Sequence, residues 1–232
     1  MPPPSYNVIE PTETFDPYDG LTEAQHEQLR SYEQLLRSFN SKINLISPDT
    51  IDTITERHIL HSLVLRVRDF PAGARIVDWG SGGGLPAIPL AIAYPEVEVI
   101  AVDSVGKKMR AVRSMARRLG LDNLFAWAGR AENWPDTAHY SVSRATAPLV
   151  DLWQWHTRAV SELSSEPEES DWAPGLITLK GGDLTKEIQT LLEVYPDTRV
   201  REIPLRSLLD DKLPHAPYFA KKCMLEVTAA AS

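Results

Sequence analysis

An aspartate and three alternating glycines form the stretch of this sequence with the clearest chemical meaning. Asp78-x-Gly80-x-Gly82-x-Gly84 directly follows the apolar run 75–79. Glycine tolerates positive φ and lets a ligand lie against bare backbone. This turn can therefore hold a flat ligand that carries positive and negative groups, such as S-adenosylmethionine. In that interpretation Asp78 faces the amino group of the ligand.

A second acid ends the next apolar run. Asp103 follows Gly82 by twenty-one residues, and a carboxylate in this place can accept hydrogen bonds from both ribose hydroxyls of a nucleotide-like ligand. Dinucleotide-binding folds share that placement, but their G-x-G-x-x-G turn needs a third glycine where Leu85 stands. The spacing therefore favours S-adenosylmethionine over a dinucleotide, with a purely structural turn as the other alternative.

Alternating strand and helix patterns surround these residues. β-rich runs are predicted at 75–79, 97–103, 124–128, 139–144, 175–180, 198–205 and 219–228, and helical patterns begin near 85, 106, 147 and 183. Strands that alternate with helices predict a parallel sheet covered on both faces, and the last two strands, which have no helix between them, predict an antiparallel hairpin at its edge. Helical spacing of apolar residues from Leu21 onward predicts a helical cap over 21–72, followed by the ligand-binding domain over 73–232.

The net charge of −8 is unevenly distributed. Residues 1–20 hold four acids and no base, and residues 161–172 hold five acids and no base. Their content of Pro, Ser and acids predicts a mobile acidic tail over 1–20 and a solvated acidic loop over 161–174. Since the remaining charges nearly balance, the acidity of the whole chain does not exclude a nucleic-acid partner.

One segment is strongly cationic. Residues 106–120 hold six cations and no acid, and on a helix one face gathers the basic side chains Lys107, Arg110, Arg113, Arg117 and Arg118. This face is either an ordinary solvated surface or a surface that contacts phosphates.

Cysteine content and hydropathy argue against a disulfide-bonded, metal-binding or membrane protein. The single cysteine, Cys223, forbids an internal disulfide, and without cysteine partners a structural zinc site is not expected. We expect no other metal either, because His58 and His61 lack further ligands. No run approaches the roughly 18 apolar residues of a membrane span, and the start lacks a signal-type stretch, so we expect a cytoplasmic protein without a membrane partner.

Seven motifs together resemble the RsmG/GidB family, bacterial methyltransferases of 16S ribosomal RNA. They are INLIS, RHILHS, DWGSGGGLPAIPLAI, VDSVGKK, AGRAENW, VSRATAP and LKGG. The resemblance implies an α/β fold with a Rossmann-like seven-strand methyltransferase sheet, mostly parallel with an antiparallel C-terminal edge hairpin, and an N-terminal helical cap. It implies methyl transfer from S-adenosylmethionine to the N7 of a guanine (position 527 type, in the 530 loop). The partner would be 16S ribosomal RNA or the small-subunit particle, and the protein would act as a monomer.

The sequence departs from the family at three places. The family usually has an acid where His61 stands, a small aliphatic residue at Trp79, and Thr-Gly-Pro-Gly where this chain has residues 81–84. We expect Trp79 to alter packing beside the cofactor and His61 to remove a salt bridge on the substrate side. A small-molecule methyltransferase and a non-catalytic regulator that binds S-adenosylmethionine remain alternatives.

The predicted site residues follow from these motifs. The cofactor residues are Asp78, Gly80, Ser81, Gly82, Gly84, Leu85, Asp103, Ser104, Ala131, Glu132 and Arg144. Guanine N7 already has a free lone pair, so no general base is required, and Arg144 and Lys180 are expected to position the substrate. The predicted RNA-binding residues are Arg57, Lys107, Arg110, Arg113, Arg117 and Arg130.

The four residues outside the cationic segment also have structural interpretations. Arg144 suits an ion pair at the end of a strand, and Lys180 suits a helix-capping turn. Arg130 suits a salt bridge with Glu132. Arg57, together with His58, suits the ordering of the cap above the cofactor.

Overall fold

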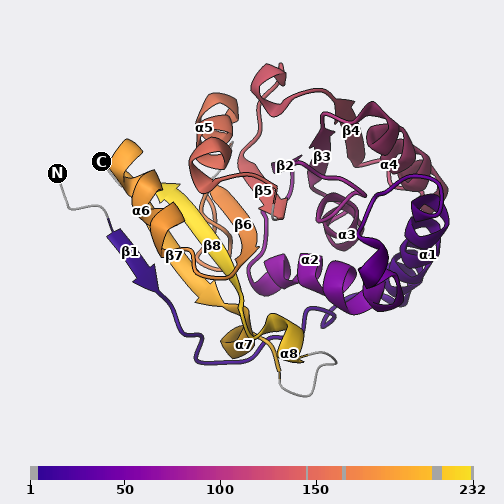
Figure 1. Ribbon diagram of the computed structural model, residues 1–232, viewed down its shortest axis with the longest axis horizontal. Helices are drawn as coiled ribbons and strands as arrows, with labels where there is room; N and C mark the ends of the chain where they lie inside the picture. The colour runs from indigo at the N-terminus through magenta and orange to yellow at the C-terminus, as the bar shows by residue number, and fades with distance from the viewer. Residues whose placement is uncertain (1–4, 145, 164–165, 211–215, 231–232) are drawn as a thin grey trace.

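The computed structural model describes residues 5–144, 146–163, 166–210 and 216–230, in which an eight-stranded sheet lies between two layers of helices (Figure 1). The strands lie in the order β1-β7-β8-β6-β5-β2-β3-β4. Their bounds are β1 Ser5–Val8, β2 Arg75–Trp79, β3 Glu98–Asp103, β4 Leu124–Ala128, β5 Tyr140–Arg144, β6 Leu176–Gly181, β7 Thr198–Pro204 and β8 Lys222–Ala229.

Most neighbouring strands are parallel, as predicted. β8 is antiparallel to both of its neighbours, β6 and β7, so the predicted antiparallel hairpin is present. It does not form the edge, because β1 pairs in parallel with β7 and covers it (Figure 1). The sheet has eight strands rather than seven for the same reason. Residues 5–8 of the predicted mobile tail are therefore an ordered strand, whose backbone groups satisfy the otherwise open edge of β7.

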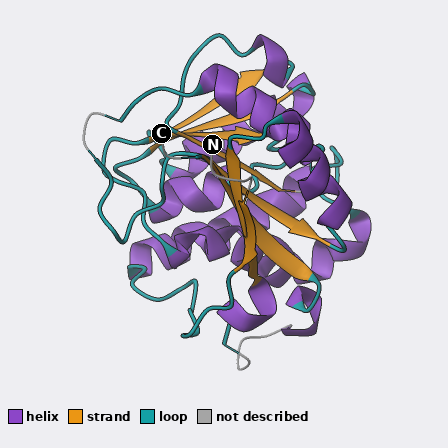
Figure 2. Ribbon diagram, turned by 90° about the vertical axis from the view of Figure 1, so that its left-hand side faces the viewer, coloured by secondary structure: helices purple, strands orange, loops and turns teal. Residues whose placement is uncertain are grey.

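Helices cover both faces of the sheet (Figure 2). The longer ones are α1 Glu23–Asn40, α3 Ala87–Ala93, α4 Gly106–Leu119, α5 Leu149–Ala159 and α6 Thr185–Val194, and the shorter ones are α2 His61–Leu63, α7 Leu205–Leu208 and α8 Ala216–Phe219. Shorter 3-10 or π turns occupy Pro48–Thr53, Thr55–Leu60, Val64–Val67 and Ala131–Asn133. Among the described residues, no helix has the length and apolar character needed to cross a membrane.

Alternating side chains of the central strands divide the core in two. Ile76 and Val99 pack with the layer of α1, α3 and α4, whereas Val77 and Ile100 pack with the layer of α5 and α6. This period of two is the reason that these short apolar strands can be buried on both faces.

The segment predicted as a helical cap packs directly on the sheet domain. α1 begins with a capping box in which the Thr22 side chain accepts from Gln25 N and the Gln25 side chain accepts from Thr22 N. Leu29, Tyr32 and Leu36 project from one face of α1 into the same core as α3 and α4. The cap therefore shares its core with the sheet, and its position is fixed relative to the glycine turn.

The acidic loop is anchored by its one aromatic residue, Trp172. Trp172 is fully buried, and its indole N–H donates to Leu65 O at 2.9 Å. Asp69 and Asp171 form a short parallel bridge beside it. Residues 164 and 165 lie outside the described residues, but the end of the loop is packed rather than fully solvated, because burial of Trp172 removes a large apolar surface from water.

Candidate active site

The glycine turn follows β2 and leads into α3. Gly80 and Gly84 both have positive φ, 74° and 90°. A Cβ built on Gly80 would lie 1.9 Å from Thr146 Cγ2, so only a residue without a side chain lets the 146–148 turn approach here. Tyr32 of α1 holds the other side of the turn, with its hydroxyl donating to Gly83 O at 3.0 Å.

Asp103 closes the turn from the end of β3. Its Oδ2 accepts from Gly82 N at 3.0 Å and its Oδ1 from Val105 N at 2.8 Å. Two backbone donors therefore fix the carboxylate where β2 and β3 both end, and the side chain remains at the surface of a pocket. A carboxylate fixed in this place can accept hydrogen bonds from the two hydroxyls of a ribose. This is the role that the spacing of Asp103 from the glycines suggests.

We call this pocket the cofactor pocket, because five of the eleven residues predicted to bind the cofactor line it. It is lined by the predicted residues Gly80, Asp103, Ser104, Ala131 and Glu132, and also by Val102, Gly129, Arg130, Thr146 and Trp155. The first group comes from the ends of β2, β3 and β4, which meet because parallel strands place their carboxyl ends on one edge. Ser81, Gly82, Gly84 and Leu85 shape the turn beneath the pocket and do not line it.

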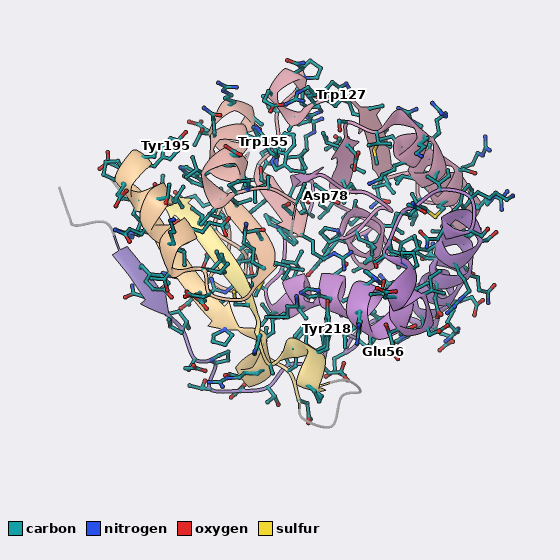
Figure 3. The ribbon with its side chains drawn as sticks, viewed as in Figure 1. Glu56, Asp78, Trp127, Trp155, Tyr195 and Tyr218 are labelled. Carbon is teal, nitrogen blue, oxygen red and sulfur yellow. The ribbon has the colours of Figure 1, made fainter. Side chains whose placement is uncertain are left out.

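Thr146 and Trp155 were not predicted from the sequence. Trp155 lies on α5 (Figure 3) and lines the same pocket as Gly80 of the glycine turn. Trp79 packs edge-on against Trp155, with ring centroids 6.0 Å apart, and against Trp134 at 5.4 Å. Its indole N–H donates to Ser141 Oγ at 3.0 Å. The buried Trp79 therefore supports Trp155, which lines the pocket.

Asp78 lies deeper than the pocket. Its side chain is fully buried near the middle of the molecule (Figure 3), and Oδ2 accepts from Ala87 N at 3.2 Å, at the start of α3. Burial raises the pKa of Asp78 to about 7, against the lowering effect of hydrogen bonds. This aspartate ties the turn to α3 and does not itself line the cofactor pocket.

Arg144, at the end of β5, was also predicted to contact the cofactor, but it does not line the cofactor pocket and points toward the cap. Its Nη1 donates to Arg57 O at 3.1 Å and to His58 Nδ1 at 2.9 Å. Burial lowers the pKa of Arg144, and burial together with the Arg144 charge lowers the pKa of His58 to about 3. No carboxylate of the described residues forms with Arg144 the strand-end ion pair that is its structural alternative.

Aromatic rings surround the other cap residues. Arg57 lies over the ring of Tyr218 on α8, 5.2 Å from its centroid, and Lys222 Nζ lies 5.3 Å from the same centroid. His61 packs edge-on against Tyr218 and Phe219, and burial lowers its pKa well below the ordinary value. His61 is therefore a buried, neutral ring beside Tyr218, whose position Figure 3 shows.

Lys180 lies in a second pocket, outside the cofactor pocket. It forms a short ion pair with Glu187 of α6 and donates to Ala147 O at 2.8 Å. Glu187 Oε1 also accepts from Leu149 N at 2.6 Å, so it caps the start of α5. Lys180 was predicted as a site residue, whereas Glu187 was not. The sequence indicates Glu187 only through its place on a helix, seven residues after Lys180.

The basic face of α4 is exposed. Lys107, Arg110, Arg113 and Arg117 all point to solvent, and no cation of α4 forms an ion pair with a described acid. Arg113 differs from the others because its guanidinium donates to Ala126 O at 2.7 Å. Arg130 borders the cofactor pocket and forms the 3.2 Å pair with Glu132 that its structural interpretation predicted.

The fold is that of the Rossmann-like methyltransferases. Geranyl diphosphate C-methyltransferase from Streptomyces coelicolor A3(2), solved in complex with Mg²⁺, geranyl diphosphate and S-adenosyl-L-homocysteine, has a similar fold. Its TM-score is 0.55 at 14% identity, covering 90% of this chain and 99% of that chain.

The family within this class follows from closer relatives. Residues 25–165 match the family described as GidB, rRNA small subunit methyltransferase G. The Ribosomal RNA small subunit methyltransferase G of Salinibacter ruber is 54% identical over 213 residues, which cover 92% of this chain and 97% of that protein. The protein of the same name from Cytophaga hutchinsonii is 40% identical over 175 residues, covering 75% and 83%. This chain belongs to the rRNA small subunit methyltransferase G family.

Proposed function

We propose that this protein transfers the methyl group of S-adenosylmethionine to the N7 of a guanine in 16S ribosomal RNA, the guanine of the 530 loop. The observation that carries the proposal is the pocket at the carboxyl ends of β2, β3 and β4, in a chain that belongs to this family. The relatives are named as methyltransferases of small-subunit ribosomal RNA.

The residues of the pocket fit the proposed cofactor. Asp103 offers a fixed carboxylate to the ribose hydroxyls, and Gly80 and Thr146 line the pocket beside it. Trp155 offers an apolar wall, and the backbone of Gly129 to Glu132 can receive the edge of an adenine. When bound, S-adenosylmethionine would supply a methyl group activated by its sulfonium.

The acceptor needs positioning rather than deprotonation. Guanine N7 holds a free lone pair near neutral pH, so the protein has to align N7 with the methyl group and leave the product cation undisturbed. Arg144 uses Nη1 for the cap, and its other N–H groups have no hydrogen-bond partner among the described residues. In the proposal they anchor the acceptor nucleotide through a phosphate.

The basic face of α4 supplies a surface for the RNA backbone. Unpaired cations on one helix attract phosphates, and a small metabolite would gain nothing from them. In the proposal Lys107, Arg110 and Arg117 contact RNA phosphates, with Arg57 and Arg130 nearer to the pocket.

A methyl-transfer assay tests the proposed function. Tritiated S-adenosylmethionine is offered with naked 16S RNA, with 30S particles, with assembly intermediates and with a panel of small metabolites. We expect label in RNA at one guanine, where reduction and aniline treatment should cut the strand because N7-methylguanine is labile. Label only in a metabolite would identify a small-molecule methyltransferase, and cofactor binding without transfer to any acceptor would identify a regulator. Either outcome would overturn the proposal.

A further inference from the structure

A second pocket adjoins the cofactor pocket at the carboxyl edge of the sheet. Thr146 lines both pockets, whereas Lys180, Leu184 and Glu187 line only the second. The turn over 146–148 therefore separates the two spaces, and a group held in the second pocket can reach the first across Thr146.

Two charged side chains are fixed in this second pocket. Lys180 is held by Ala147 O and by Glu187, and Glu187 Oε1 is held by Lys180 and by Leu149 N. Lys180 is 8% exposed and Glu187 26% exposed. Among the described residues, Glu187 Oε2 has no hydrogen-bond partner, and Lys180 has one ammonium N–H left. The pair therefore presents one donor beside one acceptor at the pocket.

Guanine carries the complementary groups in the same order. Its O6 accepts a hydrogen bond, and the adjacent N1–H and 2-amino group donate. Adenine presents the reverse at these positions, an amino donor beside an N1 acceptor, so a lysine beside a glutamate would repel it. A fixed carboxylate also strengthens the hydrogen bonds that it accepts.

We infer that the Lys180–Glu187 pair recognises the guanine base, with Glu187 Oε2 accepting from N1–H and the 2-amino group. This inference rests on the proposed function, because it concerns the acceptor of that reaction. Around the base, O6 lies between N7 and N1. With O6 at Lys180 and N1 at Glu187, N7 lies on the far side of O6 from Glu187, and the inference requires this side to face Thr146, which lines both pockets. Glu187 is thus a specificity-determining residue that makes no contact with the methyl donor.

The test compares guanosine with inosine at the methylated position. Inosine keeps O6, N1–H and N7 but lacks the 2-amino group. For the wild-type protein, we expect inosine to lower kcat/KM by about tenfold to a hundredfold, the effect of losing one hydrogen bond to a charged acceptor. Adenosine should be a still poorer acceptor, since its edge is reversed.

The variant Glu187→Gln separates recognition from helix capping. Glutamine retains a carbonyl oxygen for Leu149 N but loses the charge that the guanine donors need. We expect a similar fall in kcat/KM for guanosine, little further loss for inosine, and a guanosine-to-inosine ratio near one. Glu193→Gln on the same helix is the matched control, because Glu193 lines neither pocket, and it should keep the wild-type ratio. Calorimetric affinity for S-adenosylmethionine should be unchanged in both variants.

Each outcome decides the inference. A wild-type protein that methylates guanosine and inosine equally well would overturn it, even if Glu187→Gln failed to fold. A Glu187→Gln protein that retains the wild-type ratio would reduce Glu187 to a helix cap. Both results leave the proposed function intact, because guanosine is still methylated. Absence of methyl transfer to any RNA would overturn the proposed function, and this inference with it.

Discussion

Arg144 donates from Nη1 to Nδ1 of His58 at 2.9 Å, which joins the end of β5 to the turn that precedes α2. A guanidinium has no acceptor, so Nδ1 of His58 must accept and its proton must lie on Nε2. That nitrogen lies 2.7 Å from Thr50 Oγ1, to which it donates. The hydrogen bond from Arg144 therefore requires a neutral His58 ring, since an imidazolium would place a second positive charge beside Arg144.

The first prediction concerns the protonation of His58. Its pKa is lowered to about 3 by burial and by Arg144, so we expect the neutral Nε2–H form from pH 5 to 8. Nitrogen-15 chemical shifts of the labelled ring measure the tautomer directly, and His26, which is only partly buried, provides a comparison within the same protein. A His58 ring that becomes doubly protonated near pH 6 would contradict the geometry.

The second prediction concerns cofactor affinity. Asp103→Ala should weaken binding of S-adenosylmethionine and of its demethylated product by roughly 1.5–3 kcal/mol, because a charged acceptor is lost from the ribose hydroxyls. Isothermal titration calorimetry measures both affinities. Asp122→Ala is the control, since this exposed acid lies outside the cofactor pocket. Equal affinities in the Asp103 variant and the wild-type protein would place the ribose elsewhere.

The sequence predicted the central strands well, because their apolar runs are local signals. β2 and β4 have the predicted bounds 75–79 and 124–128. The pairing of β1 with β7 was missed, since an acidic, proline-rich composition says nothing about which distant strand has an open edge. Long-range pairing of this kind depends on the assembled sheet.

Gly80 and Asp103 were expected to lie together because of their spacing along the chain, and both line one pocket. Gly80 and Asp103 belong to consecutive strand ends, so their separation identifies them. Thr146 and Trp155 reach the same pocket from β5 and α5, and only the folded sheet brings those elements beside it. The direction of Arg144 was also not predictable, because its partner His58 is 86 residues away.

The third prediction concerns the charge state of Asp78. Its pKa is raised to about 7 in the folded protein, against about 4 when unfolded. A raised pKa means that the stability from the neutral carboxyl is complete below about pH 4 and is lost as the pH rises to about 7. Asn does not ionise, so the Asp78→Asn variant lacks this loss of stability. Its free energy of unfolding minus that of the wild-type protein should therefore increase by about 2–4 kcal/mol from pH 4 to pH 8.

Urea denaturation at several pH values measures that difference. Buried His58, His61 and His156 also titrate on unfolding, but they are shared by the two proteins, so their contributions cancel in the comparison. A difference in unfolding free energy that stays constant from pH 4 to 8 would show that Asp78 ionises normally.

The fourth prediction concerns RNA affinity. Replacing Arg110 and Arg117 together with Ala should weaken RNA binding by a similar factor for different sequences, and should lower the slope of log K against log salt concentration by about one to two. Arg113 is unsuitable for this test because it also holds Ala126 O. Arg30→Ala is the control, since Glu23 and Glu27 already pair with Arg30. An unchanged slope in the double variant would make the α4 face an ordinary solvated surface.

The fifth prediction concerns the chemical step. Arg144→Ala should leave cofactor affinity nearly unchanged and lower the single-turnover rate by about tenfold to a hundredfold, because charge-assisted hydrogen bonds to the acceptor are lost. At saturating cofactor the wild-type rate should stay flat from pH 6 to 8.5, since N7 is already unprotonated and His58 does not titrate there.

Asp78 is a buried group whose pKa of about 7 lies within this pH range, and it ties the glycine turn to the start of α3. Its ionisation near pH 7 should therefore change cofactor affinity and appear only at subsaturating S-adenosylmethionine. Asp78→Asn should remove that dependence and leave the saturated profile flat. A steep limb in the saturated profile that disappears on mutation of a single histidine or acid would reveal a general base. The acceptor would then have to be an amine or hydroxyl, because a ring nitrogen with a free lone pair has no proton to lose.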